Sequence, residues 1–204
     1  MPKLSQSRIE HNQAAIETAA LRVFTRRGYE AASIQDIARE AGLSKSSVYH
    51  HVASKEKLLS HALERAFKSL GAALDDPAVL KAAPLDALRT AFERAVTVTL
   101  KYHQEVDLLQ RIKGNSPVER DALARRRKAD TVFTMLVRNA IRAGELRDDI
   151  DPRLITRLML GMSNSITQWY QPGGKLSPEQ IAAAAVDVVF AGLALIDPLA
   201  ALMQ

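Results

Sequence analysis

The segment GLSKSSVYHHVASKEKLL, Gly42–Leu59, gathers hydroxyl, imidazole, phenol and ammonium groups on a short stretch of chain. These groups donate and accept hydrogen bonds, and side chains of these types contact base edges and phosphates in protein–DNA complexes. The residues whose side chains could reach base edges are Lys45, Ser46, Ser47, Tyr49 and His50. This composition indicates a contact with nucleic acid.

A short helix over residues 45–51 must position these side chains. Ser44 is expected to cap its start, and Val48 and Val52 are expected to face inward and anchor it. A helix of this length spans about 10 Å, and the major groove of B-form DNA is about 12 Å wide. The spacing therefore predicts a helix that can lie in the groove with its polar side chains toward the bases.

A second short helix and a glycine turn are predicted just before it. Ser33 is the expected N-cap, with Asp36 three residues later, and Gly42 is expected to end the helix. Two short helices separated by a glycine turn form a helix-turn-helix. Ser33 and Lys55, at the starts of flanking helices, are expected to hold phosphates, because helix-start N–H groups favour anions and lysine adds a charge.

Each of these features also has a purely structural explanation. Serines at helix starts are ordinary caps, and a lysine-rich turn is commonly a solvated surface. A metal site at His50 and His51 is disfavoured by geometry, because adjacent helical side chains point about 100° apart and chelation needs a spacing of three or four. We therefore expect no metal site at these histidines, and His51 is expected to pack at the helix end. No cofactor is expected either.

The chain of 204 residues carries a formal net charge of +5, which favours nucleic acid, an anionic membrane surface or an acidic protein as partner. The basic excess lies in residues 1–70 and 111–130. There is no cysteine, so disulfides, thiolate metal sites and a cysteine nucleophile are excluded. Neither a secretory core nor a membrane-spanning apolar stretch is found, so we expect a cytoplasmic protein.

Apolar residues recur at steps of three and four along almost the whole chain, and strand patterns are nearly absent. We predict an all-α fold: a three-helix, helix-turn-helix DNA-binding domain over residues 1–58, joined to a larger helical ligand-binding and dimerisation domain over residues 59–204. Capping residues followed by proline mark three later helix starts, at Ser116, Asp151 and Ser177.

Residues 16–59, IETAALRVFTRRGYEAASIQDIAREAGLSKSSVYHHVASKEKLL, resemble the N-terminal DNA-binding domain of TetR-family transcriptional regulators. The resemblance implies a homodimer that places two reading helices in successive major grooves of a partly palindromic double-stranded DNA operator. Such proteins are usually repressors that dissociate from the operator when a small ligand binds. The family's contact positions fall here on Ser33, Lys45, Ser46, Ser47, Tyr49, His50 and Lys55.

Two helical faces of the second domain are candidate dimer surfaces, although core packing would give the same periodicity. The first face comprises Leu154, Leu158, Met162, Ser165 and Trp169, and the second comprises Ile181, Ala185, Val188, Gly192 and Leu195. A mostly apolar ligand pocket is expected between the helices of this domain. Its candidate lining residues are Tyr102, Leu109, Phe133, Leu136, Met159, Met162, Asn164, Gln168 and Trp169.

The segment MSNSITQWYQPGGKLSPEQI, residues 162–181, resembles a TetR subset that carries Trp-Tyr-x-Pro-Gly-Gly before the last helix. That subset includes regulators of lipid, steroid or aromatic-acid degradation that sense acyl-CoA thioesters, so an acyl-CoA is an expected effector. The basic run Arg125–Lys128 could bind the phosphates of such a ligand, because guanidinium groups bind phosphate bidentately. A solvated helix face is the alternative explanation of this run.

Two other classes of protein compete with a transcriptional regulator. An enzyme is not indicated, because the sequence contains no glycine-rich phosphate loop, nucleophile elbow or acid–base constellation. A nonspecific basic nucleic-acid-binding or membrane-surface protein would fit the charge, but its DNA affinity would fall with salt equally on every sequence. An operator-specific protein should instead keep a preference of about 10³ or more for one site.

Overall fold

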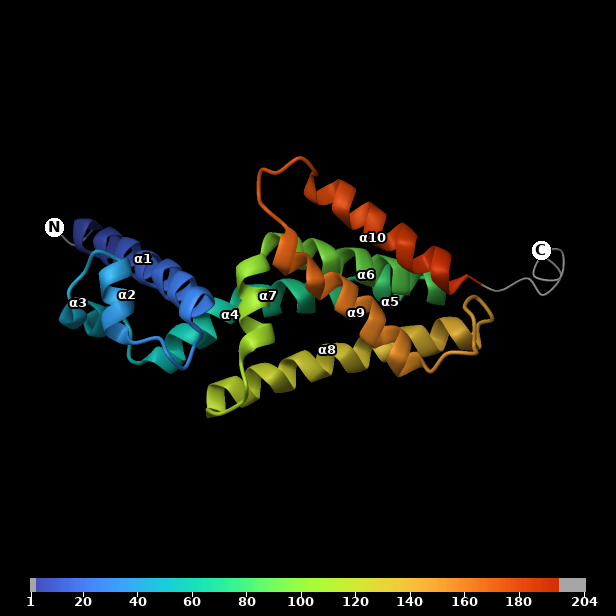
Figure 1. Cartoon of the computed structure of the whole chain (residues 1–204), viewed down its shortest axis with the longest axis horizontal. Coiled ribbons are helices and arrows are strands. Elements are labelled where there is room, and N and C mark those ends of the chain that lie inside the picture. Colours follow the sequence, from blue (N-terminus) through green and yellow to red (C-terminus); the bar gives the residue numbers. More distant parts are fainter. Residues whose placement is uncertain (1–2, 195–204) are drawn as a thin grey trace. The chain divides into compact units, whose positions relative to one another are not determined.

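The computed structural model describes residues 3–194, with side chains from Gln13 onward, and every element in this part of the chain is a helix (Figure 1). The predicted all-α fold is confirmed. The helices are α1 (Lys3–Arg27), α2 (Ile34–Glu40), α3 (Lys45–His51), α4 (Lys55–Leu74), α5 (Pro77–Leu80), α6 (Pro84–Lys101), α7 (His103–Arg111), α8 (Pro117–Arg142), α9 (Pro152–Trp169) and α10 (Pro178–Leu193). Among the described residues, no helix has the length and apolar character needed to cross a membrane.

The helices form two compact units. Of the described residues, the first unit contains 3–67 and 104–125, and the second contains 68–103 and 126–194. The expected domain boundary after residue 58 falls within α4, where Leu58 and Leu59 are both fully buried in the core of the first unit. The start of α4 thus packs with the helix-turn-helix, and a functional division at this boundary stays a prediction.

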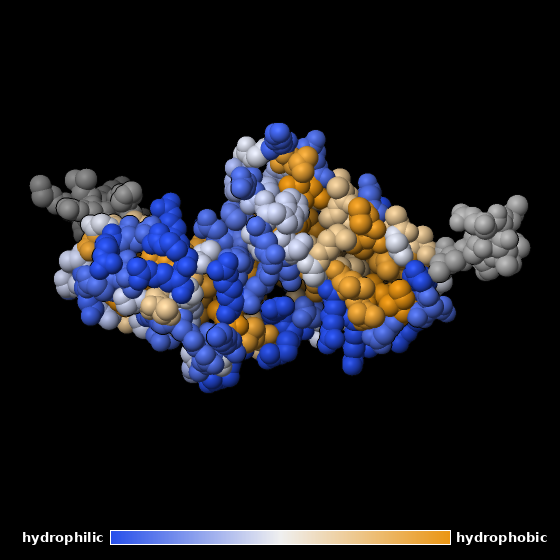
Figure 2. All heavy atoms as spheres, in the orientation of Figure 1, coloured by the Kyte–Doolittle hydropathy of each residue, from blue (hydrophilic) through white to orange (hydrophobic). Residues whose placement is uncertain are grey.

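The core of the first unit holds the three N-terminal helices together. Phe24 of α1, Ile37 of α2 and Val48 of α3 belong to one cluster, and none of them has exposed surface. Tyr29, just after α1, packs edge-on against Phe24 with ring centroids 5.2 Å apart. Full burial of an aliphatic or aromatic side chain contributes about 1.5–3 kcal/mol, so this cluster fixes α3 to the unit. The face of the unit seen in Figure 2 is mostly hydrophilic.

Local capping signals set the boundaries of α2 and α3, as predicted. The Ser33 Oγ accepts a hydrogen bond from the Asp36 N–H, and the Ser44 Oγ accepts one from the Ser47 N–H, each over 3.1 Å. Both expected N-caps are therefore confirmed. Gly42 adopts a φ of +67°, a left-handed conformation that ends α2 and that residues with a Cβ adopt only with strain.

The later helix starts also follow the predicted signals. Ser116 and Ser177 each cap a helix through the hydroxyl group, and each is paired with the residue three positions on in a capping box. The Asp151 carboxylate accepts hydrogen bonds from the first two N–H groups that follow Pro152. Helices α8, α9 and α10 therefore begin where proline and its preceding cap predicted.

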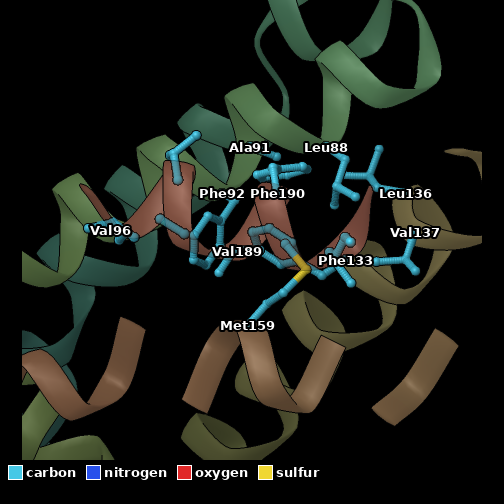
Figure 3. Close-up of a cluster of buried hydrophobic side chains, with 14 of the residues drawn as sticks. Leu88, Ala91, Phe92, Val96, Phe133, Leu136, Val137, Met159, Val189 and Phe190 are labelled. Atoms are coloured by element: carbon cyan, nitrogen blue, oxygen red, sulfur yellow. The ribbon is translucent and has the colours of Figure 1, made fainter. Parts of the chain in front are cut away.

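The second unit is a helical bundle in which α10 packs on α6, and α6 packs on α9. Part of its core is shown in Figure 3 and includes Phe92, Phe133 and Phe190. The rings of Phe92 and Phe190 meet edge-on, with centroids 6.3 Å apart. A polar pair also lies inside this unit, where the hydroxyl oxygens of Thr99 and Ser163 are 3.1 Å apart and both residues are buried.

Candidate nucleic-acid interface

Helix α3 is anchored on one side and open on the other. Val48 has no exposed surface and Val52, which follows the helix, is 6% exposed, so the two valines anchor it as expected. Lys45, Ser46, Tyr49 and His50 are exposed, and Ser47 is half-buried. The structure thus places the five candidate base contacts on one helix whose polar side is accessible to a partner.

The hydroxyl groups at the start of α3 are engaged with one another. The Oγ atoms of Ser44 and Ser46 lie 3.0 Å apart, and Ser44 also caps the helix. Lys45 and His50 carry their polar groups on exposed side chains near the two ends of α3. These two residues are therefore the strongest candidates for base recognition, and their contacts with DNA stay a prediction.

Ser33 lies at the start of α2, but its hydroxyl is committed to that helix. The Ser33 Oγ donates to the Asp36 Oδ2 over 2.6 Å. This hydrogen bond, with smaller contributions from Arg27 and Arg39, holds the pKa of the Asp36 carboxyl below its usual range. Because an ionised carboxylate at this helix start repels anions, a phosphate contact of Ser33 would compete with Asp36. That contact stays a prediction.

Lys55 has a structural role that the sequence did not indicate. Its Nζ donates to the carbonyl oxygens of Tyr29 over 3.0 Å, Glu30 over 3.2 Å and Ala32 over 3.0 Å. An ammonium group has three N–H donors, so these bonds use all of them. A phosphate contact through Nζ would have to displace at least one of these bonds, and it too stays a prediction.

The apolar candidates for a ligand pocket are divided between the two units. Phe133, Leu136 and Met159 lie in the core of the second unit, where Figure 3 shows them packed with other apolar side chains. Met162 packs against the same core, whereas Leu109 packs against the core of the first unit. A ligand that touched the buried residues would have to displace packed side chains.

The other ligand candidates lie in different environments again. The Tyr102 hydroxyl accepts a hydrogen bond from the Ser69 hydroxyl over 3.1 Å. Asn164 lines a polar groove between α8 and α9. Gln168 is exposed, and Trp169 at the end of α9 is 53% exposed. Within the described residues, the candidates are not gathered around one cavity, so their shared role as a ligand site stays a prediction.

The groove between α8 and α9 has a volume of about 550 Å³, and we call it the arginine groove. Helix α8 contributes Arg126, Arg127 and Arg138, and α9 contributes Arg153 and Arg157. The last three were not recognised in the sequence, because isolated arginines on helix faces are ordinary solvated residues. These arginines come together only because the fold places α8 and α9 on the two sides of one groove.

The basic run Arg125–Lys128 does not form one site. The Arg125 Nη1 donates to the Glu64 Oε2 over 2.8 Å, and its guanidinium carbon lies 4.2 Å from the centroid of the Phe67 ring. Lys128 is exposed and does not line the arginine groove. The two middle residues of the run are therefore the ones that the groove can use.

The first candidate dimer face is present on the surface of α9. Leu154, Leu158 and Trp169 are 48%, 63% and 53% exposed. Ser165 is exposed and Met162 is half-buried. In Figure 2, apolar side chains gather over the region of α9 and α10. This row of apolar side chains is available to a second chain.

The second candidate dimer face is divided between core and surface. Ile181 and Ala185 are 7% and 9% exposed and belong to the core of their own unit, so they do not form the expected surface. Val188, 62% exposed, and the exposed Gly192 do lie on the outer side of α10. Leu195 lies outside the described residues.

Both the N-terminal and the C-terminal part of this chain are similar in sequence to known proteins. A family model described as "Bacterial regulatory proteins, tetR family" matches residues 16–62, and one described as "Tetracyclin repressor-like, C-terminal domain" matches residues 81–193. The HTH-type transcriptional repressor KstR2 of Mycobacterium tuberculosis is 29% identical over 182 residues, which cover 87% of this chain and 90% of that protein.

Solved structures share the same fold. A TetR-family regulator from Streptomyces coelicolor A3 is 38% identical with a TM-score of 0.83, over 88% of this chain and 91% of that one. AibR, in complex with isovaleryl coenzyme A and operator DNA, is 27% identical with a TM-score of 0.71, over 88% of this chain and 98% of that one. The two family models cover the helix-turn-helix and most of the second unit, so the chain belongs to the TetR family of bacterial regulatory proteins.

Proposed function

We propose that this protein is a homodimeric cytoplasmic repressor that binds a palindromic double-stranded DNA operator and is released from it by a small molecule, an acyl-CoA thioester. The observation that carries the proposal is the exposure of Lys45, Tyr49 and His50 on a helix anchored by the buried Val48. Side chains of these types read base edges when a recognition helix lies in the major groove.

Dimerisation through the outer sides of α9 and α10 accounts for their exposed apolar residues. Leu154, Leu158 and Val188 each expose about half or more of their surface to solvent in the single chain. Covering this surface with a second copy stabilises the assembly by about 25 cal/mol for each Å² of apolar area removed from water. Gly192 is exposed on α10 and has no side chain, so a partner helix can approach closely at this position.

An acyl-CoA effector is supported by two independent likenesses. The segment before α10 carries the Trp-Tyr-x-Pro-Gly-Gly pattern at Trp169–Gly174. AibR, which shares the fold, has been solved with isovaleryl coenzyme A and operator DNA. A small molecule that binds the DNA-free protein more tightly than the DNA-bound protein lowers the affinity for the operator. The factor equals the ratio of its affinities for the two states.

Titration of the protein–operator complex tests the effector. Isovaleryl-CoA, a long-chain acyl-CoA and a cyclic acyl-CoA are each added to the complex, and fluorescence anisotropy of the labelled operator is followed. Release of the DNA by one thioester, and not by the corresponding free acid, supports the proposal. If the protein keeps the DNA bound with every thioester, the acyl-CoA effector is contradicted, but the proposal that the protein binds an operator is not.

A further inference from the structure

The arginine groove concentrates positive charge on one side of the second unit. Its five guanidinium groups share the lining with a single carboxylate, that of Asp130. The volume of about 550 Å³ lies within the range of small-molecule sites, about 300–1,000 Å³. The groove can therefore hold a ligand larger than one inorganic phosphate.

The arginines of this groove are not neutralised by ion pairs. In the part of the chain that the structure describes, none of the five has a side-chain nitrogen within 4.0 Å of a carboxylate oxygen. By contrast, Arg65, Arg94 and Arg125 form ion pairs of 3.1, 3.0 and 2.8 Å. Clustered like charges destabilise the folded chain unless an anion lies between them.

The hydroxyl groups of the groove are already used as donors. Thr131, Thr134 and Thr156 each donate to the carbonyl oxygen four residues earlier in their own helix, over 2.9, 2.8 and 2.9 Å. The guanidinium groups are therefore the main donors that the groove offers. Such a set of donors favours a ligand with several anionic acceptor oxygens.

Asp130 only partly offsets the positive charge. Burial raises the pKa of its carboxyl, against the opposing effects of Arg126 and Arg157. Even when Asp130 is ionised, one carboxylate faces five guanidinium groups. The groove thus keeps a net positive charge at neutral pH.

We infer that the arginine groove binds the phosphate groups of an organic polyphosphate, and that their source is the phosphorylated nucleotide end of coenzyme A. This inference rests on the proposed function, which supplies the acyl-CoA as effector. Guanidinium groups bind phosphate bidentately and stack on aromatic rings such as a purine. Gly161 on α9 leaves room for the ligand, because a Cβ there meets nothing within 4 Å.

A pair of charge-removing variants tests the groove. Arg138→Gln and Arg157→Gln are combined in one full-length chain, so that each helix loses one guanidinium group. The matched control combines Lys128→Gln and Arg142→Gln, which remove two exposed charges of α8 that do not line the groove. Binding of coenzyme A, ATP, inorganic pyrophosphate and pantetheine is measured by calorimetry and by the shift in melting temperature.

The inference predicts a specific loss of affinity. Each lost charge-assisted contact weakens binding about tenfold, so coenzyme A should bind the groove variant about a hundredfold more weakly than the wild type. The control variant should stay within about twofold of the wild type, because exposed charges away from the ligand contribute little. Pantetheine lacks the phosphates, so its binding should not depend on the two arginines.

The probes separate the possible sources of the phosphate groups. Tighter binding of coenzyme A than of ATP or pyrophosphate supports the coenzyme A assignment. Equal binding of all three phosphorylated probes contradicts that assignment. Equal affinity of coenzyme A for the wild type and the groove variant overturns the site, and so does a failure of every phosphorylated probe to bind.

A steric variant tests the same site without changing its charge. Gly161→Leu projects a side chain into the groove from α9 and favours the helix, since leucine has the higher helix propensity. It should weaken coenzyme A binding about tenfold or more, as expected when a binding site is filled. Unchanged binding would contradict the assigned position.

Operator binding by the same variants separates this inference from the proposed function. The groove variant should bind a selected operator like the wild type when no effector is present. If coenzyme A binds the groove variant as tightly as the wild type, and both proteins still bind the operator, the assigned ligand site is wrong and the proposed repressor function is not affected. If the wild type binds coenzyme A but shows no preference for any DNA sequence, the proposed repressor function is wrong. The assignment of the groove as the coenzyme A site is then not affected.

Discussion

The Lys55 Nζ lies 4.5 Å from the centroid of the Tyr29 ring and donates to the carbonyl oxygen of the same tyrosine over 3.0 Å. Lys55, at the start of α4, thus contacts both the Tyr29 ring and the backbone of the segment between α1 and α2. Cation–π attraction and hydrogen bonds from a charged donor both stabilise this arrangement. The lysine therefore supports the helix-turn-helix from within its own unit.

Replacing Lys55 should destabilise the protein. Lys55→Met removes the charge and the three hydrogen bonds but keeps an unbranched side chain. The free energy of unfolding should fall by about 1–3 kcal/mol, the usual cost of losing hydrogen bonds from a charged group. Chemical denaturation of this variant and of Lys57→Met measures the effect. Lys57 is exposed two residues further on, so its substitution should be nearly neutral.

The same pair of variants tests the phosphate contact expected of Lys55. Operator and random DNA are compared well below the melting temperature of both proteins. If Lys55 only stabilises the fold, the affinities of Lys55→Met for operator and random DNA stay close to those of Lys57→Met. A weakening on both DNAs, with a shallower dependence on salt, would instead show that Lys55 contacts phosphate in the complex.

Replacing His50 should affect recognition and leave stability unchanged. The side chain is exposed on α3, so His50→Ala removes no core contact. Loss of a base contact should cost about 1–3 kcal/mol on the operator and almost nothing on random DNA. Fluorescence anisotropy at several salt concentrations checks this. A parallel loss on both DNAs would show that His50 contacts the DNA backbone.

The buried hydroxyl pair of Thr99 and Ser163 should be energetically coupled. Thr99 donates to the Ala95 carbonyl oxygen, so the Ser163 hydroxyl is the donor between the two side chains. Thr99→Val leaves that donor buried without its acceptor and should cost about 1–3 kcal/mol of unfolding free energy. Adding Ser163→Ala should recover part of the loss. Strictly additive effects in a double-mutant cycle would contradict the coupling.

Tyr29 should make the fold sensitive to alkaline pH. Burial, with smaller contributions from Glu56 and Glu119, raises the pKa of Tyr29 from 10.0 to about 12. Between these values the unfolded chain loses the phenolic proton and the folded chain keeps it, so stability falls as pH rises. The free energy of unfolding of the wild type should therefore fall relative to that of Tyr29→Phe across this window. A constant difference between the two proteins would exclude this effect.

The helix-turn-helix was largely predictable because its signals are local. Ser33 and Ser44 cap helices that begin one residue later, and Gly42 adopts the positive φ that its position suggested. Val48 and Val52 follow the spacing of a buried helix face. Each of these features depends on residues within a few positions of one another, so the sequence alone carries them.

The interactions that were missed join residues far apart in the chain. Lys55 bonds to carbonyl groups 23–26 residues earlier, and backbone acceptors leave no mark in the sequence. Arg138 and Arg157 line one groove only because the fold places α8 and α9 on its two sides. The buried Ile181 and Ala185 show a related limit, since periodicity identifies an apolar helix face without saying what covers it.

The central claim is that two copies of α3 read bases in successive major grooves. Selection of preferred sites from a random oligonucleotide pool, done in parallel for the wild type and Lys45→Ala, tests it most directly. The account predicts a twofold-symmetric site with half-sites one helical turn apart, and relaxed preference at the same base pair of each half-site in the variant. A pool without a common site, or an identical site for both proteins, would contradict it.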